Sequence, residues 1–210
     1  MTKRTLDVIV AIVMLIVFSP VFLIIPILIK LNSFGPVFAD IPQRVGKNRR
    51  LFRLYKFRSM VPNAHKMLKK DSRYKELYQK YLKDNYKLAI EEDPRITRVG
   101  LFLRRYSLDE LPQIFNVFRN EMSIVGPRAY YQDELEKQQL VFPQTKLYIK
   151  KLLTVKPGIT GRWQVNGRNE VDFAERVKMD AEYAATRSIK EDVAILLKTP
   201  YAMFSGKGAI

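Results

Sequence analysis

Hydrophobic residues are spread unevenly along this 210-residue chain, and the longest apolar stretch comes first. No residue from Val8 to Ile29 carries a charge. At about 1.5 Å per residue, a helix of that length reaches across a hydrocarbon core about 30 Å thick, so the pattern predicts a membrane segment. Ser19-Pro20 lies in its middle, and a proline there removes a backbone hydrogen bond and clashes with the preceding turn. We therefore expect a helix that is broken near Ser19 and Pro20.

The broken segment leaves two topologies open. It is either a bent helix that crosses the membrane or a re-entrant helix-break-helix that enters and leaves by the same face. Lys3 and Arg4 precede it, and basic residues also follow it from Lys30 onward. Because positive flanks favour the cytoplasmic side, we predict the re-entrant form. Residues 1–30 would be the membrane anchor, and residues 31–210 one domain on the cytoplasmic face.

The rest of the chain divides into short periodic segments separated by turn residues. Basic and apolar residues alternate from Arg49 to Arg58, which predicts a strand or hairpin with one cationic face. That face either binds lipid headgroups or reaches a substrate phosphate through Lys56 and Arg58. Helical patterns cover residues 63–90, 131–139, 145–153, 171–186 and 189–204. We expect an α/β fold that is mostly helical, with a small β element and interfacial amphipathic helices.

An acidic pair, Asp109-Glu110, stands among arginines at the start of an apolar periodic run. A helix beginning near Asp109 keeps Pro112 in its first turn, where proline is tolerated, and places both carboxylates at the helix N-terminus. A capping box from Ser107 to Glu110 would push Pro112 too far into the helix. Adjacent side chains on a helix diverge by about 100°, so the two acids suit two different tasks. They can also simply stabilise the helix dipole, and spacing alone does not choose.

The composition narrows the chemistry that is available. The chain has no Cys and only one His, which excludes disulfides, thiolate nucleophiles and ordinary Cys/His zinc sites. His65 is expected to be a solvated helix residue. Catalysis would then use carboxylates, Lys, Arg, Tyr or a hard cation held by oxygen ligands. The formal net charge of +16 indicates an anionic partner: nucleic acid, phospholipid headgroups or a phosphorylated substrate.

Short motifs spread over nearly the whole chain form a specific combination. They are Ser19-Pro20, Gly35-Pro36-Val37-Phe38, Val45-Gly46-Lys47, Tyr55-Lys56-Phe57-Arg58-Ser59-Met60, Leu103-Arg104, Ser107-Leu108-Asp109-Glu110-Leu111-Pro112-Gln113, Val125-Gly126-Pro127-Arg128, Pro157-Gly158-Ile159-Thr160-Gly161 and Gln164-Val165-Asn166-Gly167-Arg168-Asn169. Together they resemble the monotopic polyprenol-phosphate phosphoglycosyl transferases, the bacterial sugar transferases that start glycan assembly on a lipid carrier. The chain is similar to the small type, which consists of the minimal catalytic unit.

The resemblance implies a reaction and a location. The enzyme would transfer a sugar-1-phosphate from a UDP-sugar to undecaprenyl (polyprenyl) phosphate and release UMP. This would be the first membrane step in making a capsule, O-antigen, exopolysaccharide or glycoprotein glycan. It would act on the cytoplasmic face of the bacterial inner membrane, among anionic phospholipids and with downstream glycosyltransferases as further partners.

The resemblance also implies site residues. Asp109 would attack the β-phosphate to form a covalent phosphosugar intermediate, with Mg²⁺ bound near Asp109 and Glu110 assisting. A carboxylate nucleophile splits one difficult transfer into two steps, and magnesium needs only oxygen ligands. The remaining substrate-binding residues carried over from the family motifs are Lys56, Arg104, Arg128, Arg168, Asp180 and Asp192.

Three local departures from the family pattern concern nucleotide-sugar contacts. Residues 39–44 are one longer than the usual segment, Ala129 replaces a proline, and Arg162-Trp163-Gln164 replaces Trp-Ala-Gln. A nucleic-acid-binding membrane protein would share the basic charge, but it does not need an acidic pair flanked by arginines. We therefore expect no nucleic-acid partner. The alternative is a basic, membrane-anchored binding or scaffold protein without catalysis.

Overall fold

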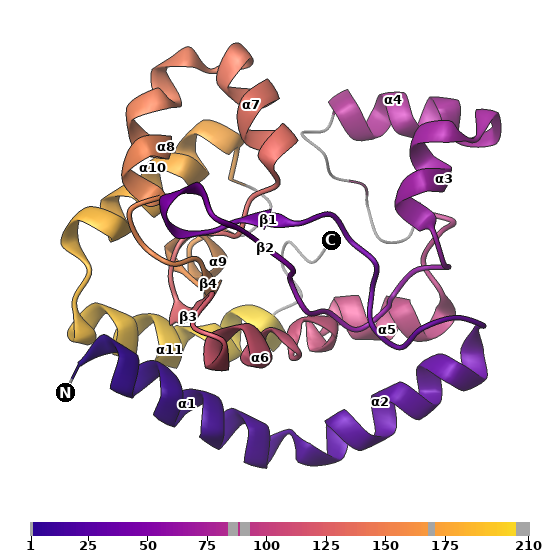
Figure 1. The fold of residues 1–210 in the computed structure, drawn as a ribbon, viewed down its shortest axis with the longest axis horizontal. Helices are drawn as coiled ribbons and strands as arrows, with labels where there is room; N and C mark the ends of the chain where they lie inside the picture. Colours follow the sequence, from indigo (N-terminus) through magenta and orange to yellow (C-terminus); the bar gives the residue numbers. More distant parts are fainter. Residues whose placement is uncertain (1, 84–87, 89–92, 168–170, 205–210) are drawn as a thin grey trace.

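The computed structural model describes residues 2–83, 88, 93–167 and 171–204. The helices there are α1 (Lys3–Val17), α2 (Ser19–Asn32), α3 (Ala64–Lys70), α4 (Lys75–Lys83), α5 (Arg98–Arg105), α6 (Gln113–Phe118), α7 (Gln132–Val141), α8 (Lys146–Leu152), α9 (Arg162–Val165), α10 (Phe173–Thr186) and α11 (Ile189–Phe204). Strands β1 (Arg44–Val45) and β2 (Leu51–Phe52) form one small sheet, and β3 (Ser123–Val125) and β4 (Gly158–Thr160) form another. In Figure 1, α1 and α2 run along one edge, while α3 and α4 lie opposite α7, α8 and α10. The predicted mostly helical fold with a small β element is confirmed.

The apolar N-terminal segment is two helices that meet at Phe18 and are bent by 61°. Pro20 lies in the first turn of α2, where its missing N–H costs no helical hydrogen bond. The Ser19 hydroxyl donates to the Ile16 carbonyl at 2.8 Å, which satisfies a backbone group near the break. The predicted break at Ser19 and Pro20 is thus confirmed. No single helix of the described chain is long and apolar enough to cross a membrane, whereas α1 and α2 meet that requirement together as a bent pair.

Both ends of this helix pair are fastened to the rest of the protein. At its start, Lys3 Nζ lies 2.7 Å from a carboxylate oxygen of Asp192. At its end, Arg58 donates to the Ser33 carbonyl at 2.9 Å, just beyond α2. Arg58 is only 4% exposed, so the side chain that alternation suggested as a phosphate contact instead holds the end of α2. The two ends of the pair therefore attach to one body, and the bend points away from it (Figure 1).

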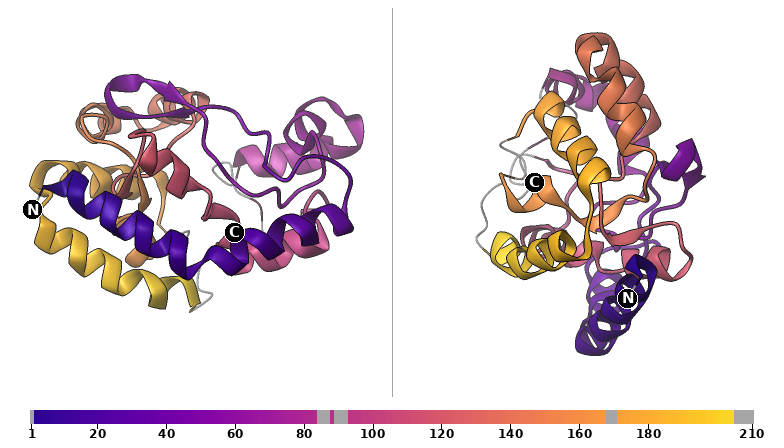
Figure 2. Two further views of the ribbon diagram at one scale, coloured as in Figure 1. Left: turned by 60° about the horizontal axis from the view of Figure 1, so that its bottom comes forward. Right: turned by 90° about the vertical axis from the view of Figure 1, so that its left-hand side faces the viewer.

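An apolar surface covers the side of the molecule formed by the helix pair and α11. Ile16 and Leu23, on either side of the bend, are 68% and 72% exposed. In Figure 2, α11 runs beside α1, and its Leu197 is also largely exposed. Ile25 and Ile29 of α2 are buried in one hydrophobic cluster with Phe57, Leu103 and Leu111. Contiguous exposed apolar surface of this kind marks a partner or a membrane.

The alternating segment forms a short hairpin, shorter than the prediction for residues 49–58. β2 pairs antiparallel with β1, and only Leu51 and Phe52 are in regular strand geometry. Burial nevertheless alternates as predicted, because Phe52 and Leu54 are buried while Leu51 and Arg53 are exposed. An isolated antiparallel bridge between Phe38 and Phe57 continues the pairing beyond this hairpin.

The second sheet was not predicted, and two of the glycine motifs make it. β3 and β4 pair in parallel, and the Gly126 N–H donates to the Thr160 carbonyl at 2.9 Å. A Cβ atom on Gly158 would lie 2.1 Å from the Gly126 nitrogen, so only glycine permits this approach of the two backbones. The contact fixes the loop that carries Arg128 against α9.

Several predicted helices need correction at their boundaries. The helix expected over residues 63–90 is interrupted at Asp71, where the chain leaves the helical conformation between α3 and α4; residues 84–87 and 89–92 lie outside the described residues. Helix α5 was not predicted. The acidic pair lies on a 3₁₀ turn (Leu108–Glu110), and α6 begins only at Gln113, because Pro112 takes the N-cap position. The remaining predicted helices are confirmed as α7, α8, α10 and α11 within a few residues.

Candidate active site

A cavity of about 460 Å³ lies in the centre of the molecule. Its wall is built from the segments after α2 and β2, from α3, from the 3₁₀ turn, and from the residues after β3 and around α9. These segments are distant in sequence but are brought together by the two small sheets. His65 of α3 lines the cavity and is half-buried with its ring 6.4 Å from that of Tyr131, so the prediction of a solvated residue was wrong.

The acidic pair meets Lys56 at this cavity. Asp109 is 2% exposed, and its Oδ2 lies 2.9 Å from Lys56 Nζ. Lys56 also donates to Oε1 of Glu110 at 3.2 Å, and this second carboxylate is far more open to solvent. The Phe57 N–H donates to the Asp109 carbonyl at 2.9 Å, which fixes the two segments side by side. The Lys56–Asp109 contact is therefore an ion pair between an ammonium group and a buried carboxylate oxygen.

The charges of this group support one another. Burial by itself lowers the pKa of Lys56, but Asp109 and then Glu110 outweigh that effect and raise the pKa. Burial raises the pKa of Glu110, yet Lys56, followed by Arg128 and Arg44, brings the pKa below its ordinary value. Lys56 and Glu110 are therefore charged at neutral pH.

Five arginines among the described residues line the cavity. Arg58 holds the end of α2 and Arg95 pairs with Asp93, and the other three are Arg44, Arg104 and Arg128. Arg104 comes from α5 and donates to the Ser59 hydroxyl at 3.0 Å. Helix α5 can approach that closely because a Cβ atom on Gly100 would meet the Ser59 carbonyl oxygen at 1.8 Å. The Arg128 guanidinium lies 5.3 Å from the Trp163 ring, and its Nε has no hydrogen-bond partner among the described residues. Planar guanidinium groups so placed are suited to binding phosphate.

Arg44 was not among the predicted site residues. Its guanidinium carbon lies 3.3 Å from the centre of the Tyr131 ring, and it donates to the Ala129 carbonyl at 3.1 Å. Burial lowers the pKa of Arg44. The sequence signal for Arg44 is its position in Arg44-Val45-Gly46, just before the alternating basic and apolar residues from Arg49 to Arg58.

Asp180 and Asp192 lie outside this cavity. Asp180 is fully buried in α10 and accepts hydrogen bonds from the Arg128 N–H at 3.0 Å and the Tyr130 hydroxyl at 2.8 Å. It positions the loop that carries Arg128 and does not line the cavity. Asp192 of α11 instead pairs with Lys3 and lines a separate cavity. Arg168 lies outside the described residues. The structure thus groups Asp109, Glu110, Lys56, Arg104 and Arg128.

We expect Asp180 to make stability depend on pH. Burial raises its pKa to about 7, although the hydrogen bonds from Arg128 and Tyr130 act against this. Because the pKa in the folded state exceeds that of the unfolded chain, the stability from this group is full below about pH 4 and is lost as pH rises through about 7. Asp180→Asn keeps a carbonyl acceptor without a charge. Thermal unfolding of Asp180→Asn in detergent should therefore show a smaller fall in midpoint between about pH 4 and pH 7.

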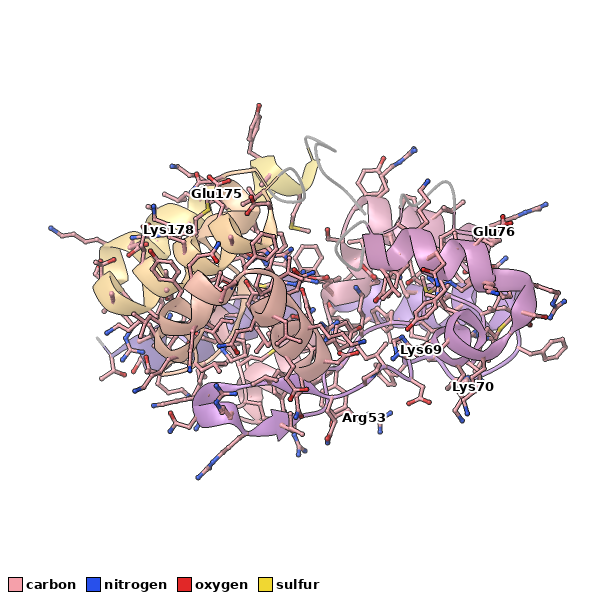
Figure 3. The ribbon with its side chains drawn as sticks, turned by 90° about the horizontal axis from the view of Figure 1, so that it is seen from above. Arg53, Lys69, Lys70, Glu76, Glu175 and Lys178 are labelled. Carbon is pink, nitrogen blue, oxygen red and sulfur yellow. The ribbon has the colours of Figure 1, made fainter. Side chains whose placement is uncertain are left out.

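The control for this series is Glu175→Gln, an exposed carboxylate on the same helix (Figure 3). It should leave the pH dependence of the wild-type midpoint unchanged. An Asp180→Asn midpoint that falls as steeply as the wild type would contradict the assignment to Asp180.

Comparison with known proteins places the chain in a family. The sequence profile of the bacterial sugar transferases matches residues 1–206, so the chain belongs to that family and is a transferase. Exopolysaccharide production protein ExoY of Sinorhizobium fredii is 39% identical over 208 residues, covering 99% of this chain and 88% of that protein.

Two larger relatives carry more specific names. The undecaprenyl-phosphate galactose phosphotransferase of Salmonella typhimurium is 40% identical over 207 residues. The UDP-glucose:undecaprenyl-phosphate glucose-1-phosphate transferase of Escherichia coli is 39% identical over 212 residues. Each match covers 99% of this chain but 41% of the relative, so the chain corresponds to about two fifths of these proteins.

Proposed function

We propose that this protein transfers a sugar-1-phosphate from a UDP-sugar to undecaprenyl phosphate, with release of UMP and a covalent aspartyl-phosphosugar intermediate. The observation that carries the proposal is the buried Asp109 carboxylate, paired with Lys56 beside a cavity lined by arginines. The names of the relatives support undecaprenyl phosphate as the acceptor and galactose or glucose as the first sugars to test.

The reaction proceeds in two displacements at the β-phosphorus. An oxygen of Asp109 forms a bond to the β-phosphorus of the UDP-sugar, and the bond from that phosphorus to the bridging oxygen of the α-phosphate breaks, so that UMP leaves. A phosphate oxygen of undecaprenyl phosphate then attacks the aspartyl phosphosugar, and the Asp109 carboxylate is restored. Asp109 Oδ2 lies 2.9 Å from Lys56 Nζ, so the attacking carboxylate would be held beside a cation at the cavity.

The cations around the cavity stabilise the charge of this reaction. Lys56 pairs with Asp109 and holds it in place, and Arg104 and Arg128 line the same cavity, where they can bind the diphosphate and the departing UMP. Glu110 is hydrogen-bonded to Lys56 but open to solvent, which suits it to handling a proton at the acceptor phosphate.

Magnesium fits the donor chemistry of the site. No group of three or more His, Cys, Asp or Glu residues within the described part of the chain could hold a metal alone. Mg²⁺, however, commonly binds through one or two carboxylates together with substrate phosphates. Asp109, assisted by Glu110, would supply the carboxylate oxygens. The ion, when bound, would neutralise diphosphate charge.

The helix pair fits a re-entrant anchor. Its start is paired with Asp192 and its end is held by Arg58, and both partners belong to the same body. A helix that crossed the bilayer would separate these ends by the membrane thickness, and one set of contacts would be lost. Such an anchor would hold Asp109 near the headgroup plane on the cytoplasmic face, where a soluble UDP-sugar and a lipid-borne phosphate can both arrive.

The proposed reaction is tested by UMP release. Purified full-length protein is incubated with undecaprenyl phosphate, Mg²⁺ and a panel of UDP-sugars that begins with UDP-galactose and UDP-glucose. Acceptor-dependent UMP release with at least one sugar is the expected result. Its absence across a broad panel would contradict the proposal and favour a membrane-anchored binding protein.

The re-entrant anchor predicts the accessibility of the N-terminus. Since the chain has no native Cys, a cysteine introduced at Thr2 can be labelled without background. A membrane-impermeant maleimide should react only after the inner membrane of spheroplasts is permeabilised. A cysteine at the exposed Lys178 of α10 serves as the cytoplasmic control. Labelling at Thr2 in intact spheroplasts would instead indicate a membrane-spanning pair.

A further inference from the structure

A second cavity, of about 320 Å³, lies where the first turn of α1 meets the start of α11 and the β1–β2 turn. It is separate from the cavity of Asp109, and its wall is strongly charged. The cations on this wall are Lys3, Arg4, Lys47, Lys156 and Arg187, and the acids are Asp7 and Asp192. Cations therefore outnumber acids by five to two.

The two acids are already bound to groups of the protein. Asp192 lies 2.7 Å from Lys3 Nζ and accepts a hydrogen bond from the Tyr183 hydroxyl at 2.7 Å. Asp7 accepts a hydrogen bond from the Ser123 hydroxyl at 2.7 Å, and Lys3 lies 3.8 Å from it. Lys3 thus contacts both acids, and the wall as a whole has more positive than negative side chains.

The remaining cations have no acidic partner. Within the described part of the chain, no carboxylate lies within 4.0 Å of a charged nitrogen of Lys47, Lys156 or Arg187. Arg4 donates to the Val117 carbonyl at 2.6 Å, and Lys156 donates to the side-chain amide oxygen of Asn120, which is neutral. Neutral acceptors fix the direction of a donor but leave its charge in place.

The electrostatic effect is visible at Lys156. Burial lowers its pKa most, and the charges of Arg4, Lys47 and Lys3 lower the pKa further, whereas Asp7 acts in the opposite direction. Several positive charges therefore converge on one hollow. An anion bound there would reverse this repulsion.

We propose that this second cavity binds the phosphate group of an anionic phospholipid. Lys47, Lys156 and Arg187 supply the charged donors, and Lys3 and Arg4 place the cavity at the end of the helix pair. The lipid assignment rests on the proposed position of α1 and α2 in the membrane, since that position brings the first turn of α1 to the level of lipid phosphates. Clusters of Lys and Arg at that level attract anionic headgroups.

The experiment measures lipid retention without any sugar substrate. Full-length protein is reconstituted in nanodiscs of mixed phosphatidylcholine and phosphatidylglycerol and then released for native mass spectrometry. The wild type should retain phosphatidylglycerol in preference to phosphatidylcholine. The triple variant Lys47→Gln, Lys156→Gln and Arg187→Gln should lower that retention by about tenfold or more. Because UDP-sugar is absent, failure to retain phosphatidylglycerol leaves the transferase proposal unaffected. Failure to release UMP likewise leaves the lipid-retention result unaffected.

The matched control removes the same charge elsewhere. Arg53→Gln, Lys70→Gln and Lys178→Gln change three exposed cations, just after β2, on α3 and on α10, that are not among the residues lining the cavity (Figure 3). This control should keep the wild-type retention. A charge-preserving variant with Lys47→Arg, Lys156→Arg and Arg187→Lys should keep most of the wild-type retention of phosphatidylglycerol. That result would show that the triple Gln variant loses lipid because it loses charge and not because it misfolds.

Two results would overturn the proposal. An equal loss in the cavity variant and the surface control would mean that phosphatidylglycerol is held by diffuse charge. Displacement of phosphatidylglycerol by inorganic phosphate, with phosphate itself retained, would mean that the site takes a soluble phosphate and that the lipid assignment is wrong.

Discussion

Asp109→Asn is expected to abolish UMP release, with a loss of about 10³-fold or more. The amide that replaces the carboxylate has the same shape but cannot accept the phosphosugar. Asp109 is the buried carboxylate of the pair, at 2% exposure, and its Oδ2 lies 2.9 Å from Lys56 Nζ. Glu110 contacts the same Lys56 Nζ at 3.2 Å but is more exposed to solvent than Asp109. The rate is measured with the sugar that gives the fastest UMP release.

The covalent intermediate gives a second measurement on the same variant. A UDP-sugar labelled in its β-phosphate should leave hydroxylamine-labile label on the wild type and none on Asp109→Asn. Glu110→Gln is the matched control, because it makes the same change one residue away. It should slow turnover severely while still accepting label. Equal labelling of wild type and Asp109→Asn would assign the nucleophile to another residue.

The sequence predicted which residues gather at the cavity better than the architecture that brings them together. Asp109, Glu110, Lys56, Arg104 and Arg128 were all identified from motifs, and the structure gathers them around one cavity. The motifs are short and local, and their residue types limit what they can do. The break at Ser19 and Pro20 was predictable for a similar reason, since the effect of proline on a helix acts within one turn.

The parts that the sequence missed depend on contacts between distant segments. β3 and β4 contain three residues each, too few for a periodic pattern, and they pair only because Gly126 and Gly158 allow close approach. Asp180 and Asp192 were expected at the substrate. Nothing in their local sequence indicates that one would support the Arg128 loop and the other the start of α1.

Lys56→Met is expected to destabilise the protein more than Asp109→Asn does. Lys56 is the cation that pairs with the buried Asp109 carboxylate among the described residues, whereas Lys56 itself has both Asp109 and Glu110 as partners. Removing Lys56 leaves a charge uncompensated at 2% exposure, which costs about 3 kcal/mol. For a chain of this size, the thermal midpoint should fall by roughly 6–12 °C. Lys70→Met, at an exposed lysine of α3, should change it little.

The double variant Lys56→Met with Asp109→Asn separates stability from catalysis. It removes both charges of the ion pair, so its thermal midpoint should recover most of what Lys56→Met lost, because the neutral pair no longer buries an uncompensated charge. UMP release should not recover, since the nucleophile is absent. Lys56→Met alone should retain a small rate, about 10²-fold below wild type, because Asp109 remains but is poorly held. If the double variant is no more stable than Lys56→Met, the two charges are not coupled, and Lys56 has no special role in holding Asp109.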